Sequence, residues 1–211
     1  MMSFKLKICG MKFPDNILEV AKLAPDYMGF IFYQGSKRFV DTLDAALLAE
    51  LPETITRVGV FVNHDLIDVV QTAEKYGLGL LQLHGGESAV YCLALKQQLA
   101  GRQIKLMKAF GVDEHFDFKS LEAFKESVDF FLFDTQTPDH GGSGKQFNWS
   151  LLEGYSLDTP YFLSGGIGLE SLAALKAIDD NRLYGVDINS RFELEPGKKD
   201  INKLKEFKRQ L

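Results

Sequence analysis

The chain contains little cysteine, since only Cys9 and Cys92 occur among its 211 residues. Two thiols do not indicate a disulfide framework, and free thiols are typical of a reducing cytoplasm. The first ten residues lack the apolar run of a signal peptide, and no stretch is long and apolar enough to span a bilayer. The sequence therefore predicts a cytoplasmic protein without a membrane partner.

Basic residues are not in excess either, because 24 Lys and Arg face 29 Asp and Glu, for a formal net charge of -5. Nucleic-acid binding needs a basic face, so we expect no nucleic-acid partner. The lysine-rich stretch 198–209 is interleaved with acidic and apolar residues. We interpret it as the solvent-facing side of a last helix.

Other absences narrow the fold and the chemistry. The chain has no Pro-, Gly- or Ser-rich linker, and no Gly-x-Gly-x-x-Gly follows its first apolar segment, which argues against a dinucleotide-binding fold. Its histidines and aspartates are not spaced as metal ligands. We expect one domain over residues 1–211, with no metal ion and no organic cofactor.

What the chain does have is a regular alternation of short apolar and longer amphipathic segments. The apolar segments predict parallel strands covered on both faces, at residues 6–8, 27–32, 57–62, 80–83, 105–110, 130–134, 161–164 and 183–187. The amphipathic segments predict helices at 15–23, 42–51, 65–76, 88–99, 148–157, 169–177 and 201–210, with a loop and then a helix in 115–127. This order predicts an α/β protein of one domain, a (β/α)₈ TIM barrel.

Barrel enzymes build their active sites at the C-terminal ends of the strands. The residues at these ends are mostly polar groups and glycines: Cys9, Arg38, Asn63, His84, Phe110, Asp134, 164–166 and 187–190. Glycine lets a backbone approach a ligand closely, and barrel phosphate sites lie after the last strands. We therefore expect a phosphate site formed by Gly142, Ser143, Gly144, Gly165, Gly166, Asn189 and Ser190.

Short motifs along nearly the whole chain resemble, in the same order, those of the phosphoribosylanthranilate isomerase family. They are KICG at 7–10, GFIF at 29–32, SKRFV at 36–40, VGVFVN at 58–63, LQLHG at 81–85, FDT at 133–135, GGSGKQFNW at 141–149, LSGGI at 163–167 and GVDINS at 185–190. The chain departs from the family pattern at Lys37, usually proline, and at Arg191, usually glycine.

The resemblance implies an Amadori rearrangement of a phosphorylated aminosugar in tryptophan biosynthesis, without a cofactor. It implies Asp134 as the general acid and Cys9 as the general base, and we expect Arg38, His84 and Asp187 to bind the substrate. An aspartic acid with an ordinary pKa of about 3.9 is almost fully ionised at pH 7. The environment of Asp134 must therefore raise its pKa if it is to donate a proton.

Two other functions remain open from the residues. A phosphosugar isomerase of histidine biosynthesis would share the phosphate end of the barrel, but it resembles this chain less because it has an aspartate where this chain has Cys9. A non-catalytic barrel that binds a sugar phosphate would need neither Cys9 nor Asp134. The oligomeric state, monomer or homodimer, is also open.

Overall fold

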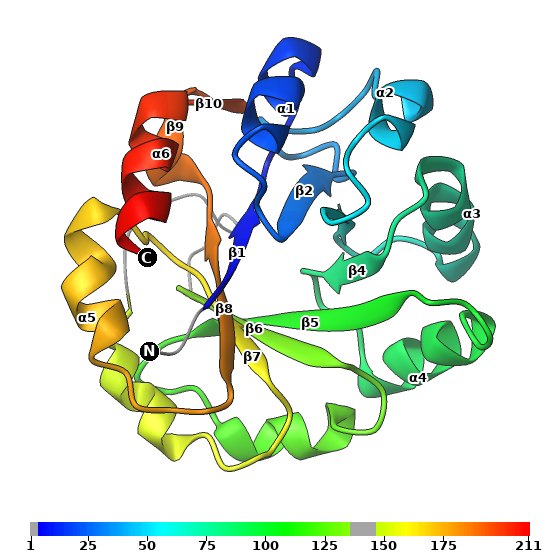
Figure 1. Cartoon of the computed structure of the whole chain (residues 1–211). Helices are drawn as coiled ribbons and strands as arrows, with labels where there is room; N and C mark the ends of the chain where they lie inside the picture. The colour runs from blue at the N-terminus through cyan, green and yellow to red at the C-terminus, as the bar shows by residue number, and fades with distance from the viewer. Residues whose placement is uncertain (1–3, 136–146) are drawn as a thin grey trace.

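The computed structural model describes residues 4–135 and 147–211. Eight parallel strands follow each other around a closed barrel, in which β1 pairs with both β2 and β8. The (β/α)₈ barrel predicted from the sequence is therefore confirmed (Figure 1). The strands are β1 Lys5–Ile8, β2 Tyr27–Ile31, β3 Thr56–Phe61, β4 Leu80–Leu83, β5 Lys105–Val112, β6 Phe130–Thr135, β7 Tyr161–Leu163 and β8 Leu183–Ile188.

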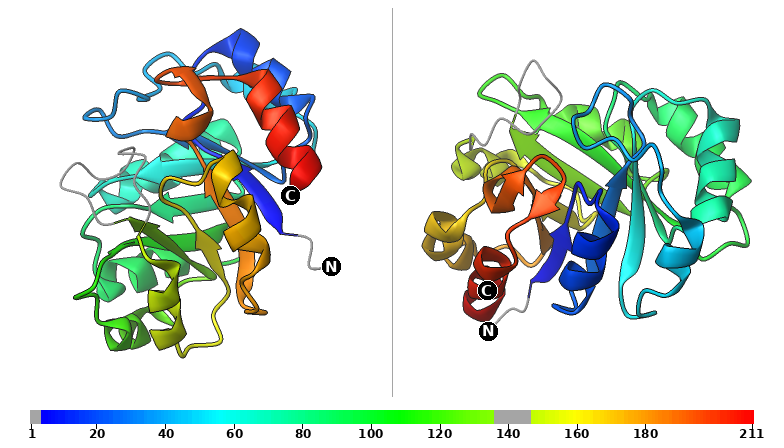
Figure 2. Two further views of the ribbon diagram at one scale, coloured as in Figure 1. Left: turned by 90° about the vertical axis from the view of Figure 1, so that its left-hand side faces the viewer. Right: turned by 90° about the horizontal axis from the view of Figure 1, so that it is seen from above.

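Helices form a ring outside the strands, and α6 lies between α5 and α1 in this ring (Figures 1 and 2). The α-helices are α1 Pro14–Ala21, α2 Ala45–Ala49, α3 Leu66–Tyr76, α4 Ala89–Gln98, α5 Leu172–Lys176 and α6 Ile201–Gln210. Local chemistry sets several of these ends. Pro14 opens α1, Ser88 accepts a hydrogen bond from Tyr91 N at the start of α4, and Gly77 ends α3 in the left-handed conformation.

Four of the predicted helices differ from the structure. The helix expected at 42–51 is only α2, because the Asp44 side chain caps it by accepting a hydrogen bond from Ala46 N. The segments 115–127 and 148–157 contain 3₁₀ helices, η1 Phe118–Phe124 and η2 Trp149–Gly154, and 169–177 divides into η3 Leu169–Ser171 and α5. 3₁₀ helices occur in short pieces and at the ends of α-helices, as η3 does directly before α5.

A two-stranded antiparallel sheet stands between β8 and α6, and the sequence analysis did not predict it. After η4 Ser190–Phe192, the strands β9 Glu193–Glu195 and β10 Lys198–Lys199 pair around Pro196 and Gly197. The interpretation of 198–209 as the solvent-facing side of one helix is therefore wrong for residues 198–200. Lys199 is buried in β10, and α6 begins only after the Asp200 cap.

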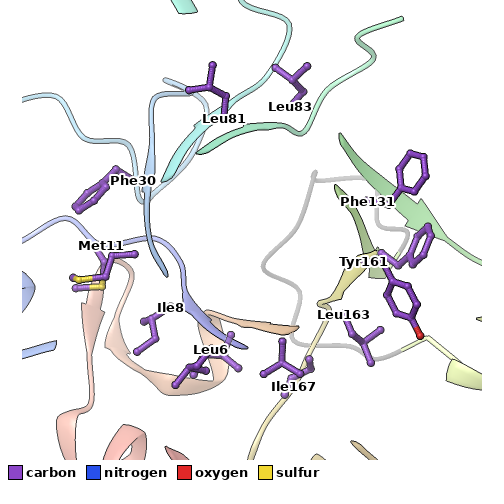
Figure 3. Packing of buried hydrophobic residues seen from close by; sticks show 14 of the residues in the cluster. Leu6, Ile8, Met11, Phe30, Leu81, Leu83, Phe131, Tyr161, Leu163 and Ile167 are labelled. Atoms are coloured by element: carbon purple, nitrogen blue, oxygen red, sulfur yellow. The ribbon is translucent and has the colours of Figure 1, made fainter. Parts of the chain in front are cut away.

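Two apolar clusters form the core. The larger one lies between strands and helices, and Figure 3 shows labelled members from β1, β2, β4, β6 and β7 around the ring of strands. The smaller one fills the inside of the barrel with side chains such as Val58, Met107, Leu132 and Phe162. On β6, Asp134 is the next inward position after Leu132, because side chains alternate along a strand. The inside of the barrel thus changes from apolar to polar toward the C-terminal strand ends.

Candidate active site

Lys7 on β1 and Cys9, which directly follows this strand, face the inside of the barrel. Leu6 and Ile8 belong to the outer core cluster, so the alternating residues Lys7 and Cys9 share the inner face. Both side chains are buried. A Cβ atom at Gly29, on the neighbouring strand β2, would lie 2.8 Å from Cys9 Sγ. The thiol therefore lies directly against the main chain of β2.

Asp187 on β8 is the register partner of Lys7, and Lys7 Nζ lies 2.9 Å from Asp187 Oδ2. Burial raises the pKa of Asp187, and Lys7 opposes this rise. The second oxygen, Asp187 Oδ1, is buried and makes no hydrogen bond within residues 4–135 and 147–211. A buried acceptor without a partner costs free energy, so it marks a position where a ligand hydroxyl can bind.

Asp134, near the end of β6, is the second carboxyl group of the site. Its Oδ1 accepts a hydrogen bond from Thr135 N at 2.8 Å. Burial raises the pKa of Asp134 to about 6, and the charge of Asp187 adds to the rise. A carboxyl group with this pKa is partly protonated near neutral pH, as a general acid requires.

His84 follows β4 and faces Asp134, with 3.6 Å between His84 Nε2 and Asp134 Oδ2. Its other ring nitrogen, Nδ1, lies 2.7 Å from the amide nitrogen of Gln82. With the amide as donor, Nδ1 accepts and the proton of a neutral imidazole is on Nε2. His84 then presents an N–H group toward the candidate acid.

A buried ion pair on the outer side of the barrel holds the segment after His84. Lys108 Nζ lies 3.2 Å from Glu87 Oε2 and donates to three backbone carbonyl oxygens, including Gly85 O at 2.9 Å. Glu87 in turn accepts hydrogen bonds from Gly85 N at 2.9 Å and Asn63 N at 2.8 Å. These contacts fix the backbone on the C-terminal side of His84.

Arg38, in the segment after β2, belongs to a group of four side chains that we call the Arg38 network: Arg38, Glu193, Lys199 and Asn189. Arg38 Nε and Nη2 donate to both carboxylate oxygens of Glu193 at 2.6–3.1 Å. Lys199 Nζ donates to Glu193 Oε1 at 2.8 Å and to Asn189 Oδ1 at 2.7 Å. Burial raises the pKa of Glu193, but the contacts with Arg38 and Lys199 outweigh it and hold the pKa below its ordinary value.

The Arg38 network closes over Gly10, the residue after Cys9. Gly10 has a φ of +76°, and a Cβ atom there would lie 2.6 Å from Arg38 Cδ and 2.7 Å from Asn189 Oδ1. A side chain at this position would therefore be strained and would also displace both neighbours. The network therefore packs against the residue that directly follows the candidate base in the chain.

The predicted phosphate site is described in part. Gly165 and Gly166 follow β7 and have φ values of +87° and +64°. Asn189 and Ser190 follow β8 and are half-buried, and Ser190 begins η4. The other three predicted residues, Gly142, Ser143 and Gly144, lie outside the described residues. The glycines and the polar side chains are therefore at the same end of the barrel as Cys9 and Asp134.

The structure brings the predicted residues Cys9, Asp134 and Asp187 into one electrostatically coupled group. Sequence reasoning missed Lys7, which alternates with Leu6 and Ile8, and Gln82, which is the polar residue of an otherwise apolar strand. That pattern could have identified both as inward-facing.

Glu193 and Lys199 were also missed, because the sequence analysis did not predict the hairpin that carries them. Arg191, at the departure from the family pattern, forms an ion pair with Glu170 at 3.3 Å, and both side chains are largely exposed.

Within residues 4–135 and 147–211, no three His, Cys, Asp or Glu side chains are grouped as metal ligands. In the same residues, no helix has the length and apolar character needed to cross a membrane.

A closed (β/α)₈ barrel with a thiol, a carboxyl group of raised pKa and cations at its C-terminal strand ends defines a barrel enzyme of the acid–base type. The family model for N-(5'-phosphoribosyl)anthranilate (PRA) isomerase matches residues 6–210. The chain belongs to this family, so the isomerase class predicted from the sequence is confirmed.

Individual relatives agree with the family model. The N-(5'-phosphoribosyl)anthranilate isomerase of Parabacteroides distasonis is 45% identical over 98% of this chain and 92% of its own length. The crystal structure of phosphoribosyl anthranilate isomerase from Thermotoga maritima is 36% identical, with a TM-score of 0.82 over 99% of this chain and 98% of that chain. A structure of such an isomerase in complex with reduced 1-(o-carboxyphenylamino)-1-deoxyribulose 5-phosphate is 31% identical, with a TM-score of 0.78 over 99% of this chain and 98% of that chain.

Proposed function

We propose that the chain converts N-(5'-phosphoribosyl)anthranilate to 1-(2-carboxyphenylamino)-1-deoxyribulose 5-phosphate in tryptophan biosynthesis, with Asp134 as general acid and Cys9 as general base. The observation that carries this assignment is the environment of Asp134. Burial raises its pKa to about 6, and it ends a different strand from the thiol. An acid and a base can therefore reach one substrate from separate sides.

Two proton transfers form an enolamine, and a proton must then move from its hydroxyl group to C1′ to give the ketone. Asp134 gives a proton to the ring oxygen of the ribose, the bond from C1′ to that oxygen breaks, and the nitrogen lone pair forms a Schiff base. Cys9 then removes the proton from C2′, and the released electron pair forms an enolamine that tautomerises to the ketone. General acid–base catalysis of this kind contributes about 10²–10⁴-fold per group.

The charges around Cys9 bear directly on its role as a base. Burial raises the pKa of the Cys9 thiol, and the cations Lys7 and Lys199 oppose the rise. A thiolate, not a thiol, removes the proton, so cations beside the sulfur favour the reactive form. We assign Lys7 this supporting role because it lies two positions before Cys9 and, like Cys9, faces the inside of the barrel.

We propose that Arg38 binds the substrate carboxylate and that Asp187 Oδ1 and His84 bind the sugar or its ring-opened form. The phosphate would lie at Gly165, Gly166, Asn189 and Ser190, with Gly142, Ser143 and Gly144 completing its site. We also propose that residues 1–211 act as one catalytic domain in the cytoplasm. A homodimer or a monomer is compatible with the Thermotoga maritima relative, described as dimeric and also obtained as monomers.

Growth rescue tests the function. The gene should rescue a tryptophan auxotroph that lacks this isomerase and should not rescue a matching histidine auxotroph. Cys9→Ser should abolish rescue, whereas Cys92→Ser, at a second buried cysteine outside the site, should retain it. Purified protein should consume the substrate with loss of anthranilate-type fluorescence. Absence of turnover and of tryptophan rescue would refute the proposal, and rescue of the histidine strain alone would assign the other pathway.

A further inference from the structure

The two edges of the Arg38 guanidinium differ in the structure. The edge formed by Nε and Nη2 is occupied by Glu193, with distances of 2.8 Å from Nε to Oε1 and 2.6 Å from Nη2 to Oε2. Within the described residues, Nη1 makes no hydrogen bond, so the outer edge keeps donors for another acceptor. A guanidinium group carries five N–H donors in one plane, and a second carboxylate can bind at the outer edge while Glu193 stays in place.

Glu193 is itself held in a fixed position. Its Oε1 accepts hydrogen bonds from Lys199 Nζ at 2.8 Å and from Gly197 N at 3.1 Å. The backbone of Lys199 is fixed in turn by Asn16, which accepts from Lys199 N at 2.6 Å and donates to Lys199 O at 3.0 Å. Asn16 and Lys199 are buried. The guanidinium plane of Arg38 is therefore oriented by a chain of contacts that reaches the helix α1.

The carboxylate of Glu193 is paired with two cations. Lys199 Nζ contacts its Oε1 and Arg38 Nη2 contacts its Oε2, so one negative charge is shared by two positive charges. The three groups together keep one net positive charge when all are ionised. Glu193 therefore orients Arg38 without cancelling its attraction for an anionic ligand, because Lys199 supplies the compensating charge.

We propose that Glu193 and Lys199 are positioning residues that determine selectivity for an arylamine carrying a carboxylate, by holding the outer edge of Arg38 toward the substrate. The inference rests on the proposed function, specifically on Arg38 as the carboxylate-binding residue. It adds that this binding depends on the hairpin β9–β10. Glu193 acts on the substrate through Arg38, whereas Lys199 fixes Glu193 and its charge also favours the Cys9 thiolate.

Glu193→Gln tests this proposal against a matched control, Glu195→Gln. Glu195 lies on the same strand β9 but is exposed, and its side chain forms an ion pair with Lys198 at 3.9 Å. The probes are reduced 1-(o-carboxyphenylamino)-1-deoxyribulose 5-phosphate and its phenylamino counterpart without the carboxylate. Glu193→Gln should weaken binding of the carboxylated probe about tenfold and raise KM similarly, with a much smaller change in kcat. Binding of the counterpart, and all constants of Glu195→Gln, should stay within about twofold of the parent.

A double-mutant cycle separates positioning from a general structural role. If Glu193 acts through Arg38, Glu193→Gln should cause no further loss in an Arg38→Ala background. Glu193→Asp, which keeps the charge beside Lys199, should fold even if Glu193→Gln does not, and it should cause a smaller loss of the same selectivity.

Unchanged or tighter binding of the carboxylated probe to the Glu193 variants, or an equal loss in the Arg38→Ala background, would overturn the inference. A parent chain without turnover would instead refute the proposed function.

Discussion

Two buried lysine–carboxylate pairs in this barrel have the same chemistry and different surroundings. Lys108 and Glu87 lie on the outer side of the barrel, and between them they contact three backbone carbonyl oxygens and two backbone N–H groups. Lys7 and Asp187 lie inside the barrel, and Asp187 Oδ1 makes no hydrogen bond among the described residues. The outer pair is satisfied by the fold, whereas the inner pair keeps an acceptor for a ligand. A buried acceptor without a hydrogen bond therefore distinguishes the ion pair inside the site from the ion pair that supports the barrel.

The largest expected effect concerns the acid beside the inner pair. Asp134→Asn removes the proton donor while leaving both pairs intact, so kcat should fall by about 10³-fold or more. Affinity for the reduced product analogue should change much less. Thermal unfolding should show no loss of stability, because the change removes a buried charge. A variant that keeps kcat within about tenfold of the parent would exclude Asp134 as the acid.

The two pairs themselves are compared by Lys108→Met and Lys7→Met. Lys108→Met leaves Glu87 buried without its cation, and it should lower the free energy of unfolding by about 3–5 kcal/mol. Lys7→Met should lower it less, because Asp187 has a raised pKa and can take a proton.

The order of the losses should reverse for turnover, where Lys7→Met removes a cation from Cys9 and Lys108→Met removes none from the reacting groups. Urea unfolding and kcat/KM measured on the same preparations test this. Equal losses of stability and of turnover in both variants would show that the two ion pairs do not differ in role.

The pH dependence of kcat/KM sharpens the comparison further. Cys9 must lose a proton and Asp134 must keep one. Below about pH 6, Asp134 is protonated and the rate should rise with pH as the thiolate fraction grows. Above about pH 6 the gain in thiolate is offset by loss of protonated Asp134, so the profile should become flat until Cys9 is ionised. Lys7→Met should lower this plateau, whereas Lys108→Met should preserve the shape of the profile.

The smallest effect is expected at a third ion pair, Lys5 and Asp26. Lys5 is on the same strand as Lys7, but this pair is partly exposed to solvent. Their side chains are 47% and 35% exposed, and 2.7 Å separates Lys5 Nζ from Asp26 Oδ1. Exposed pairs contribute about 0–1 kcal/mol, so Lys5→Met should lower stability by less than about 1 kcal/mol and leave turnover unchanged. A loss of stability as large as that of Lys108→Met would show that burial does not determine how much each ion pair contributes.

The sequence predicted the strands well because parallel strands covered on both faces are nearly continuous apolar segments, as at 80–83 and 130–134. Helix boundaries were less predictable, since the Asp44 cap shortens α2 and two segments form 3₁₀ helices. The resemblance supplied roles for Cys9 and Asp134.

The contact between Arg38 and Glu193 could not be predicted, because these residues are 155 positions apart and no periodicity connects them. Pro196 and Gly197 were the one local signal of a turn that would have indicated the hairpin.

The pairing of β1 with β8 also has a consequence for the order in which the protein becomes active. Cys9 is synthesised long before its neighbours Asp187 and Lys199, which follow it by 178 and 190 positions. Contacts so distant in sequence form late, because closing a long loop costs entropy before the contact is gained. A nascent or partly folded chain therefore contains the thiol without the charges that surround it. Recovery of turnover during refolding should accordingly coincide with closure of the barrel.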